Sequence, residues 1–465
     1  MHRAYMVVFL CVLATAAQAQ SATSSSASAL EPQVDAIASK VLRDTGVPSA
    51  SIAVVREGKV VLRKAYGYAD IATQRNATPD MRYSIGSVSK QFTATAILWL
   101  QQQGKLSLDD KVAKYLPELT RADEVTIRQL LSHTSGYGDY APQDYIPGWM
   151  LKPATAQEIL DGWAKKPLEF NPGDRWQYSN TNYVIAGAIV EKVSGMKLFD
   201  VLERLVFRPL DMQSAFNADQ NHNNPDVTGY FRYALGPQRP APKEGPGWMF
   251  AAGELSMTAP DLAKWDISVM NQTILQPQSY RQMETEVLLN NGAGTRYGLG
   301  LDISRIAGHR ALEHSGEVSG FVSDNIVLPD DKEAVVVLTN EDASRAAGNI
   351  GQQIANYLVQ QQRSSAGNAI ATAKQIFVDL QQGKIDRQQF TADANGYFTE
   401  EAINDYRASL GPLGAPAAFE MTSEGGRGGM MNRNFRVSAG GRELTVSTYV
   451  MPDGKYEQYL VIPVE

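Results

Sequence analysis

The stretch that most constrains this chain is residues 82–92, where Ser87 and Lys90 stand three residues apart just before a long apolar-patterned run. The run is followed by Gly104, a residue that suits the C-terminal end of a helix. We therefore expect a helix that begins at or just before Ser87 and stops at Gly104. In its first turn the two side chains would face the same side, within reach of each other.

This pair has the chemistry of an acyl-transfer nucleophile. A lysine amine can take the proton of a serine hydroxyl, and the unpaired N–H groups at a helix start can hold a developing oxyanion. The pattern alone is weak, because Ser-x-x-Lys fixes only two positions. A second copy, Ser194-Gly-Met-Lys197, follows a helical run that breaks at Ser194 and is typical of a turn. The assignment therefore depends on companion residues elsewhere.

The composition is that of a globular protein with more than one domain. A length of 465 residues suggests two or three domains, and 43% hydrophobic residues are enough to bury large cores. The net charge is −7, without a basic block or a basic–aromatic stripe. Nucleic acid is therefore not an expected partner, and the expected substrate is a small molecule or a peptide. The sequence does not indicate the oligomeric state.

The first residues predict export. His2 and Arg3 precede an apolar stretch, 5–17, and Ala17-Gln-Ala19 has the pattern of a signal-peptide cleavage site. We expect residues 1–19 to be a signal peptide and the protein to be periplasmic or secreted. The apolar stretch is too short to span a bilayer and no other sufficient run follows, so stable membrane insertion is not expected.

The mature protein is expected to have no thiol, because the one cysteine, Cys11, lies in the segment to be removed. A cysteine nucleophile and a thiolate metal site are thereby excluded. The five histidines show no metal-ligand spacing, so we expect no metal and no cofactor.

Two hairpin patterns predict the main sheet. β-favouring runs flank turns within 51–62 and within 320–339, near the two ends of one region. They favour a single antiparallel sheet, covered by helices at 34–42 and 350–362, with helical segments between the hairpins forming a lobe. The fold class expected for residues 31–360 is therefore α/β, an antiparallel sheet flanked by helices beside a helical lobe.

Composition also indicates the flanking segments. Residues 20–30 are rich in Ser and Ala and are expected to be a flexible leader, and the polar segment 361–368 is expected to be a linker. Beyond it, helical segments precede four strand-like runs, with hairpin turns at 439–442 and 452–455. Residues 369–465 are expected to form a small α+β accessory domain without a catalytic set.

Two more short motifs follow the Ser-x-x-Lys pair in the chain, namely Tyr178-x-Asn180 and His314-Ser-Gly316. With these motifs the chain resembles the serine β-lactamase and penicillin-binding-protein superfamily, above all its class C β-lactamase and D-aminopeptidase/esterase branch. The resemblance covers roughly residues 30–360. Two longer passages also look like family sequences, residues 130–136 and 172–180.

The resemblance implies a role for each motif. Ser87 would be the nucleophile, Lys90 its proton acceptor, and Tyr178 a second base or proton shuttle. The remaining motif residues would bind substrate: Asn180 would hold the substrate amide or Lys90, a strand carrying His314, Ser315 and Gly316 would edge the pocket, and the N–H groups of Ser87 and Glu317 would form the oxyanion hole. A free lysine titrates near pKa ~10.4, so Lys90 must have a lowered pKa to act as a base.

One position departs from the family pattern. Most β-lactamases carry lysine in the third motif, where this chain has His314, which is mostly neutral at pH 7. A fixed positive charge against a substrate carboxylate is therefore missing. We expect an exported serine hydrolase that acts on amides or esters through a Ser87 acyl-enzyme, with D-amino-acid-containing peptides or small esters favoured over β-lactams.

Other interpretations stay open at this point. The protein would instead be a sensor that binds β-lactams or peptidoglycan fragments and acylates without efficient turnover. Tyr178 would be a packed aromatic, and His314 a hydrogen-bonded structural histidine. His133 is expected to be structural, positioning the loop that follows it. No Gly-x-Ser-x-Gly motif is present, which weighs against an α/β-hydrolase.

Overall fold

The computed structural model describes residues 30–143, 145–219 and 226–464. The expected signal peptide, 1–19, and almost all of the expected leader, 20–30, lie outside the described residues. The chain divides into two compact units, Glu31–Leu358 and a second that includes the residues from Val359 onward. No helix in the described ranges is long and apolar enough to cross a bilayer.

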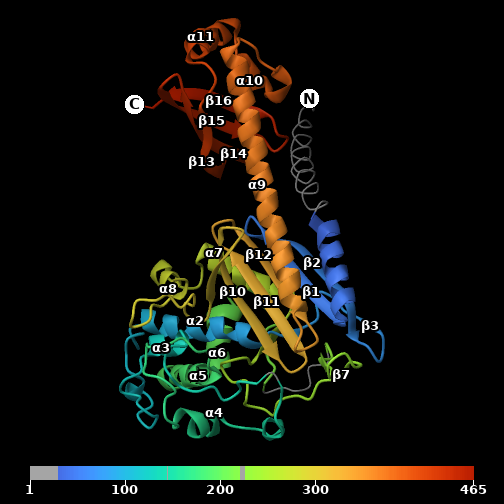
Figure 1. Cartoon of the computed structure of the whole chain (residues 1–465), viewed down its shortest axis with the longest axis vertical. Helices are drawn as coiled ribbons and strands as arrows, with labels where there is room; N and C mark the ends of the chain where they lie inside the picture. The colour runs from blue at the N-terminus through green and yellow to red at the C-terminus, as the bar shows by residue number, and fades with distance from the viewer. Residues whose placement is uncertain (1–29, 144, 220–225, 465) are drawn as a thin grey trace, which may run out of the picture. The chain divides into compact units, whose positions relative to one another are not determined.

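The first unit is built on one seven-stranded sheet (Figure 1). Its strand order is β3-β2-β1-β12-β11-β10-β9, and every neighbouring pair is antiparallel. The two predicted hairpins therefore meet in the middle of one sheet, where β1 pairs with β12. The strands are β1 Ser49–Arg56, β2 Lys59–Asp70, β3 Arg75–Asn76, β9 Asp302–Ile306, β10 His309–Val318, β11 Phe321–Leu328 and β12 Glu333–Thr339.

The central strands are apolar because both faces of the sheet are covered. Every residue of β12 is buried, and in β1 only Arg56 is not. Strand β2, nearer the sheet edge, exposes much of its length. The turn between β1 and β2 places Glu57 and Gly58 at φ of 50° and 70°, which lets the chain reverse within two residues.

Two long helical segments cover one face of the sheet. The helical residues 30–45 contact β2, where the Tyr66 hydroxyl donates to Asp35 at 2.7 Å. Helix α9 (Ala346–Gln381) lies against β11 so closely that a Cβ on Gly351 would come within 2.2 Å of the Asp324 carboxylate. The predicted helical cover of this face is confirmed.

Helices α2 (Ser89–Gln102) and α7 (Ala259–Asn271) cover the opposite face. The Gln91 amide of α2 donates to Asn325 of β11 at 2.9 Å, and the indole N–H of Trp265 on α7 donates to Gln91 at 2.8 Å. This buried network ties both helices to the sheet, because each of these polar groups would lose a hydrogen-bond partner if a helix moved away.

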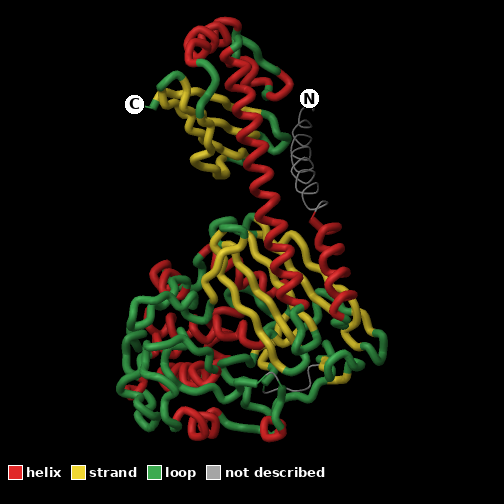
Figure 2. The backbone as a smooth tube through the Cα atoms, in the orientation of Figure 1, coloured by secondary structure: helices red, strands yellow, loops and turns green. Residues whose placement is uncertain are grey.

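The helical lobe lies beside the sheet and consists of short helices joined by irregular loops (Figure 2). Thr126 with Gln129 and Thr155 with Glu158 form capping boxes that begin α3 and α4. The α-helices of this region are α3 Ile127–Leu131, α4 Ala156–Ile159, α5 Asn180–Ser194, α6 Leu198–Leu202 and α8 Pro277–Met283.

The second unit is the expected α+β domain. Its four strands form a sheet in chain order, and aromatic residues from both helices and strands fill its core, among them Phe377, Phe398 and Phe435. Its further elements are α10 Ala392–Tyr397, α11 Glu400–Leu410, β13 Ala418–Arg427, β14 Met430–Ala439, β15 Arg442–Val450 and β16 Tyr456–Pro463.

The segment 361–368, which we expected to be a linker, is helical. It lies inside α9, which continues from Ala346 to Gln381 without a break. The expectation rested on polarity, which indicates exposure but not backbone conformation, and the segment has no proline to interrupt a helix.

A substitution at Gly367 tests this helical backbone. Gly367 is exposed within α9, and an added Cβ would meet no atom within 4 Å. Gly367→Ala should therefore stabilise the protein by up to ~1 kcal/mol, and Gly367→Pro should destabilise it by ~3 kcal/mol. Urea unfolding followed by circular dichroism measures both changes. An unstructured linker at 361–368 would leave the unfolding curve unaffected by either change.

Candidate active site

Ser87 lies where strand β4 (Tyr83–Ser84) turns into α2. A single 3-10 turn, Gly86–Val88, leads directly into the α-helix, so helical backbone begins one residue before Ser87. At the other end Gly104 adopts φ 67°, and the N–H of the next residue, Lys105, donates to Leu100. The predicted helix is confirmed at both ends.

Lys90 is fully buried, and its amine has three oxygen neighbours. Nζ lies 2.9 Å from Ser87 Oγ, 2.8 Å from Asn180 Oδ1 and 2.8 Å from the Ala252 carbonyl oxygen. The oxygens of Asn180 and Ala252 can only accept hydrogen bonds, so each accepts one N–H group of the amine. The remaining position on Nζ faces the serine hydroxyl, and in the neutral amine that position is a lone pair.

The environment of Lys90 gives it a lowered pKa. Burial lowers the pKa of the Lys90 amine to about 7, against the opposing effect of the Asp139 carboxylate. Near neutral pH a large share of the molecules therefore holds Lys90 as a neutral amine. This is the condition that a lysine base must meet.

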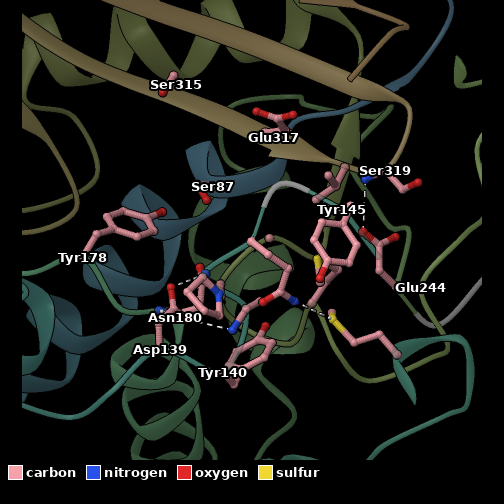
Figure 3. A pocket seen from close by; sticks show the side chains of 18 of the residues that line it. Ser87, Asp139, Tyr140, Tyr145, Tyr178, Asn180, Glu244, Ser315, Glu317 and Ser319 are labelled. Atoms are coloured by element: carbon pink, nitrogen blue, oxygen red, sulfur yellow. Dashed lines mark hydrogen bonds between the residues drawn. The ribbon is translucent and has the colours of Figure 1, made fainter. Parts of the chain in front are cut away.

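Tyr178 lies in the loop before α5 and lines the same cavity as Ser87 (Figure 3). Burial raises the pKa of Tyr178 well above its ordinary value. Its ring stacks on His133, with ring centroids 4.3 Å apart, and the Lys90 Nζ lies 4.9 Å from its ring centroid. His133 is itself buried, and its Nδ1 accepts the backbone N–H of Ser179 at 3.2 Å. This hydrogen bond holds the His133 ring in place against the Tyr178 ring.

The third motif lies on β10, at a part of the strand that faces the helix start. Strand β9 pairs with β10 as far as Asp302↔Glu313, so residues 314–318 of β10 lie beyond that pairing. A Cβ on Gly316 would lie 1.9 Å from the Ile85 carbonyl oxygen, and one on Gly86 would lie 2.7 Å from the Glu317 nitrogen. Two glycines thus bring the backbone of Glu317 beside that of Ser87, as an oxyanion hole made from these two N–H groups requires.

His314 is a neutral part of the wall. Its Nδ1 lies 2.6 Å from the Ser315 carbonyl oxygen and must donate, so Nε2 accepts from the Tyr297 hydroxyl at 2.8 Å. Burial, with a smaller contribution from Lys90, lowers the pKa of His314 to about 3. Both ring nitrogens are engaged and the ring carries no charge at neutral pH, in line with what the sequence suggested for this position.

These groups surround a cavity of about 620 Å³ (Figure 3). Ser87, Tyr178 and Asn180 lie on one side, and Glu317, Tyr145 and Glu244 lie around the other (Figure 3). The described lining residues include neither lysine nor arginine. They include six acidic side chains: Asp139, Glu169, Glu244, Asp302, Glu317 and Asp342.

Sequence reasoning placed all eight predicted site residues in one region but missed several neighbours. The seven-stranded sheet and the contacts of Lys90 and Gly316 bring together segments that lie far apart in the chain. The neighbours that were missed, Asp139, Tyr297 and the Ala252 carbonyl, belong to no sequence motif. The one available signal was an acidic residue, Asp139, in a loop otherwise rich in Gly and Tyr. In the described ranges no cluster of three or more His, Cys, Asp or Glu side chains is arranged to hold a metal ion.

The second Ser-x-x-Lys copy is a turn, as its sequence indicated. Ser194 ends α5, and Gly195 follows at φ 71°. Lys197 is exposed and pairs with Glu191 at 3.2 Å, away from any serine nucleophile.

Among known proteins, the curated relatives include Protein flp of Staphylococcus aureus, 28% identical over 342 residues that make up 70% of this chain and 67% of the relative. A D-aminopeptidase of Brucella anthropi is 29% identical over 297 residues, which are 63% of this chain and 56% of that protein. Among solved structures, a D-stereospecific amidohydrolase from Streptomyces sp. has a TM-score of 0.60 at 26% identity, covering 69% of this chain and 97% of the other.

The protein family described as Beta-lactamase matches residues 34–358, which is well over half of the chain. The match begins in the first covering helix and ends inside α9, so it contains the whole sheet and the lobe. The fold, the buried serine–lysine pair and this match agree. The chain belongs to the Beta-lactamase family and is a serine hydrolase of that family.

Proposed function

We propose that the chain is an exported amide and ester hydrolase that forms an acyl-enzyme on Ser87 and prefers D-amino-acid-containing peptides or small esters to β-lactams. The observation that carries the proposal is the Lys90 amine, whose two N–H bonds are taken by carbonyl groups so that its third position faces Ser87. Export rests on the signal-peptide pattern of residues 1–19.

The acylation step uses Lys90 as the base. The neutral amine accepts the Ser87 proton while Oγ bonds to the substrate carbonyl carbon, and the backbone N–H groups of Ser87 and Glu317 stabilise the oxyanion. Tyr178, kept protonated by its raised pKa, donates its proton to the leaving nitrogen or oxygen as the carbonyl bond to that atom breaks. The tyrosine is reprotonated from the Lys90 ammonium.

Deacylation reverses these transfers. A water molecule takes the place of the leaving group, loses a proton to the Lys90–Tyr178 pair and attacks the ester carbon. The ester bond to Ser87 breaks, and Oγ recovers its proton from Lys90. One hydrolysis is thereby split into two steps with the same base and the same oxyanion donors.

The cavity electrostatics support substrates without a carboxylate near the reacting bond. His314 is neutral and the described lining carries six acidic side chains, so a substrate carboxylate would meet repulsion, whereas an ammonium group would be attracted. The relatives named D-aminopeptidase and D-stereospecific amidohydrolase support the same substrate class.

Ser87→Ala tests the nucleophile. We expect the purified wild type to turn over p-nitrophenyl esters or D-amino-acid anilides, a chromogenic cephalosporin to react more slowly, and the folded variant to lose at least ~10³-fold in kcat. Full activity in Ser87→Ala would contradict the proposal. A stable adduct on Ser87 without turnover, seen by intact mass, would assign the protein to the sensor class instead.

A matched pair of substrates tests the charge preference. D-alanine p-nitroanilide carries an ammonium group, and N-succinyl-D-alanine p-nitroanilide replaces it with a carboxylate at the same leaving group. We expect kcat/KM to favour the first by ~10-fold or more, since a favourable charge contact is replaced by an unfavourable one and each is worth about 1 kcal/mol. Added salt should reduce the ratio of the two kcat/KM values, because salt screens the charges. Equal rates, or a preference for the succinyl compound, would contradict the charge argument.

Lys90→Met tests the base in two ways. Wild-type kcat/KM should fall as the pH drops below about 7, because the protonated amine accepts no proton, and Lys90→Met should be inactive. The variant should also be more stable near neutral pH. Between a folded pKa of about 7 and an unfolded value near ~10.4, the unfolded chain binds the extra proton, so wild-type stability rises with pH across this window.

The stability advantage of Lys90→Met should therefore be largest near pH 7 and below, and should shrink toward pH ~10. Thermal unfolding across this range measures it, with Lys59→Met, at the exposed first residue of β2, as the matched control. A constant difference between wild type and Lys90→Met at all pH values would show that the pKa of Lys90 is not lowered by folding.

A further inference from the structure

Asp139 lies in the loop after α3 and lines the cavity next to Asn180 (Figure 3). Its carboxylate accepts three hydrogen bonds. Oδ1 accepts the backbone N–H of Asn180 at 3.0 Å and that of Ala141 at 3.1 Å, and Oδ2 accepts the Asn180 side-chain amide nitrogen at 3.2 Å. One acidic side chain thus holds both the backbone and the side chain of the residue that begins α5.

These contacts decide which end of the Asn180 amide faces Lys90. A carboxylate only accepts, so the Asn180 NH₂ group must turn toward Asp139 and the carbonyl oxygen must turn the other way. That oxygen is the acceptor 2.8 Å from Lys90 Nζ. With the amide reversed, its NH₂ group would face the amine, and one of the two acceptors that orient the lysine would be lost.

The same carboxylate acts on Lys90 through its charge. Burial raises the pKa of Asp139, and the hydrogen bonds from Ala141 and Asn180 lower it, because three donors stabilise the charged form. The negative charge of Asp139 in turn raises the pKa of Lys90 against the effect of burial. The other groups that face the amine are the rings of Tyr178 and Tyr183, with the histidines 133 and 314 coupled to it by charge.

We propose that Asp139 is a positioning residue for the reaction, which fixes the Asn180 amide with its oxygen toward Lys90 and places a negative charge behind that amide. Its hydrogen bonds within the described residues go to Ala141 and Asn180, so its link to Ser87 runs through Asn180 and Lys90. The inference rests on the proposed role of Lys90 as the base.

The test is the pH profile of kcat/KM for Asp139→Asn, measured with a p-nitrophenyl ester. The loss of the charge should move the acid-side midpoint to lower pH, and the loss of a fixed amide should reduce the plateau by ~10- to 100-fold, the effect of one charge-assisted hydrogen bond. Asp219→Asn is the matched control, since Asp219 is also buried and accepts two backbone N–H groups, those of Gly247 and Met249, but it does not line this cavity. Its midpoint should coincide with that of the wild type.

A second readout needs no turnover and separates this inference from the proposed function. Without Asp139 the pKa of Lys90 falls further, so Lys90→Met should raise the melting temperature near neutral pH by more in the Asp139→Asn background than in the wild type. Wild-type protein that hydrolyses no substrate would refute the proposed function, and with it a role of Asp139 in the reaction, whereas the larger increment would still show that the Asp139 charge acts on Lys90.

An unchanged or raised midpoint in Asp139→Asn, or equal increments in both backgrounds, would overturn the proposal. If Asp139→Asn does not fold, Asp139→Glu decides, because it keeps the charge and changes only its reach. A folded Glu variant with the wild-type midpoint supports the positioning role. An unfolded or shifted one leaves Asp139 a purely structural residue.

Discussion

The burial of one amine is the constraint on which the rest of the structure depends. Lys90 is fully enclosed, and an amine in that position is tolerated only if its N–H bonds find acceptors. The acceptors come from Asn180 and Ala252, which lie 90 and 162 residues further along the chain. The start of α5 and the loop before β8 (Leu255–Met257) must therefore close over α2 before the site exists.

The second constraint is backbone proximity. Gly86 and Gly316 lie in segments more than two hundred residues apart, and each meets backbone atoms of the other segment at distances that exclude a side chain. Their contact places the start of a helix against the part of β10 that lies beyond its pairing with β9. The backbone N–H group of Ser87, at a helix start, and that of Glu317, on a strand, thereby become neighbours. Neither a helix nor a sheet alone provides such a pair of donors.

Much of this architecture was predictable from the sequence because its signals are local. The helix that carries Ser87, the two hairpins and the motifs are each indicated by residues that are close together in the sequence. The contacts of Asp139 and Tyr297 were not predictable, because each depends on which distant loop the fold brings next to it. The helical conformation of the expected linker, 361–368, was not predicted for another reason: polarity indicates exposure, and an exposed segment can still be a helix.

Eleven of the fourteen residues of α2 are buried, so this helix has no face turned to water. Few substitutions are tolerated along such a helix. Substitutions along it must fit the sheet on one side and the lobe on the other. The buried amine of Lys90 already lowers the free energy of unfolding, so selection removes further destabilising substitutions more readily. The residues of α2 that never meet a substrate should therefore vary as slowly among descendants of this chain as those that do.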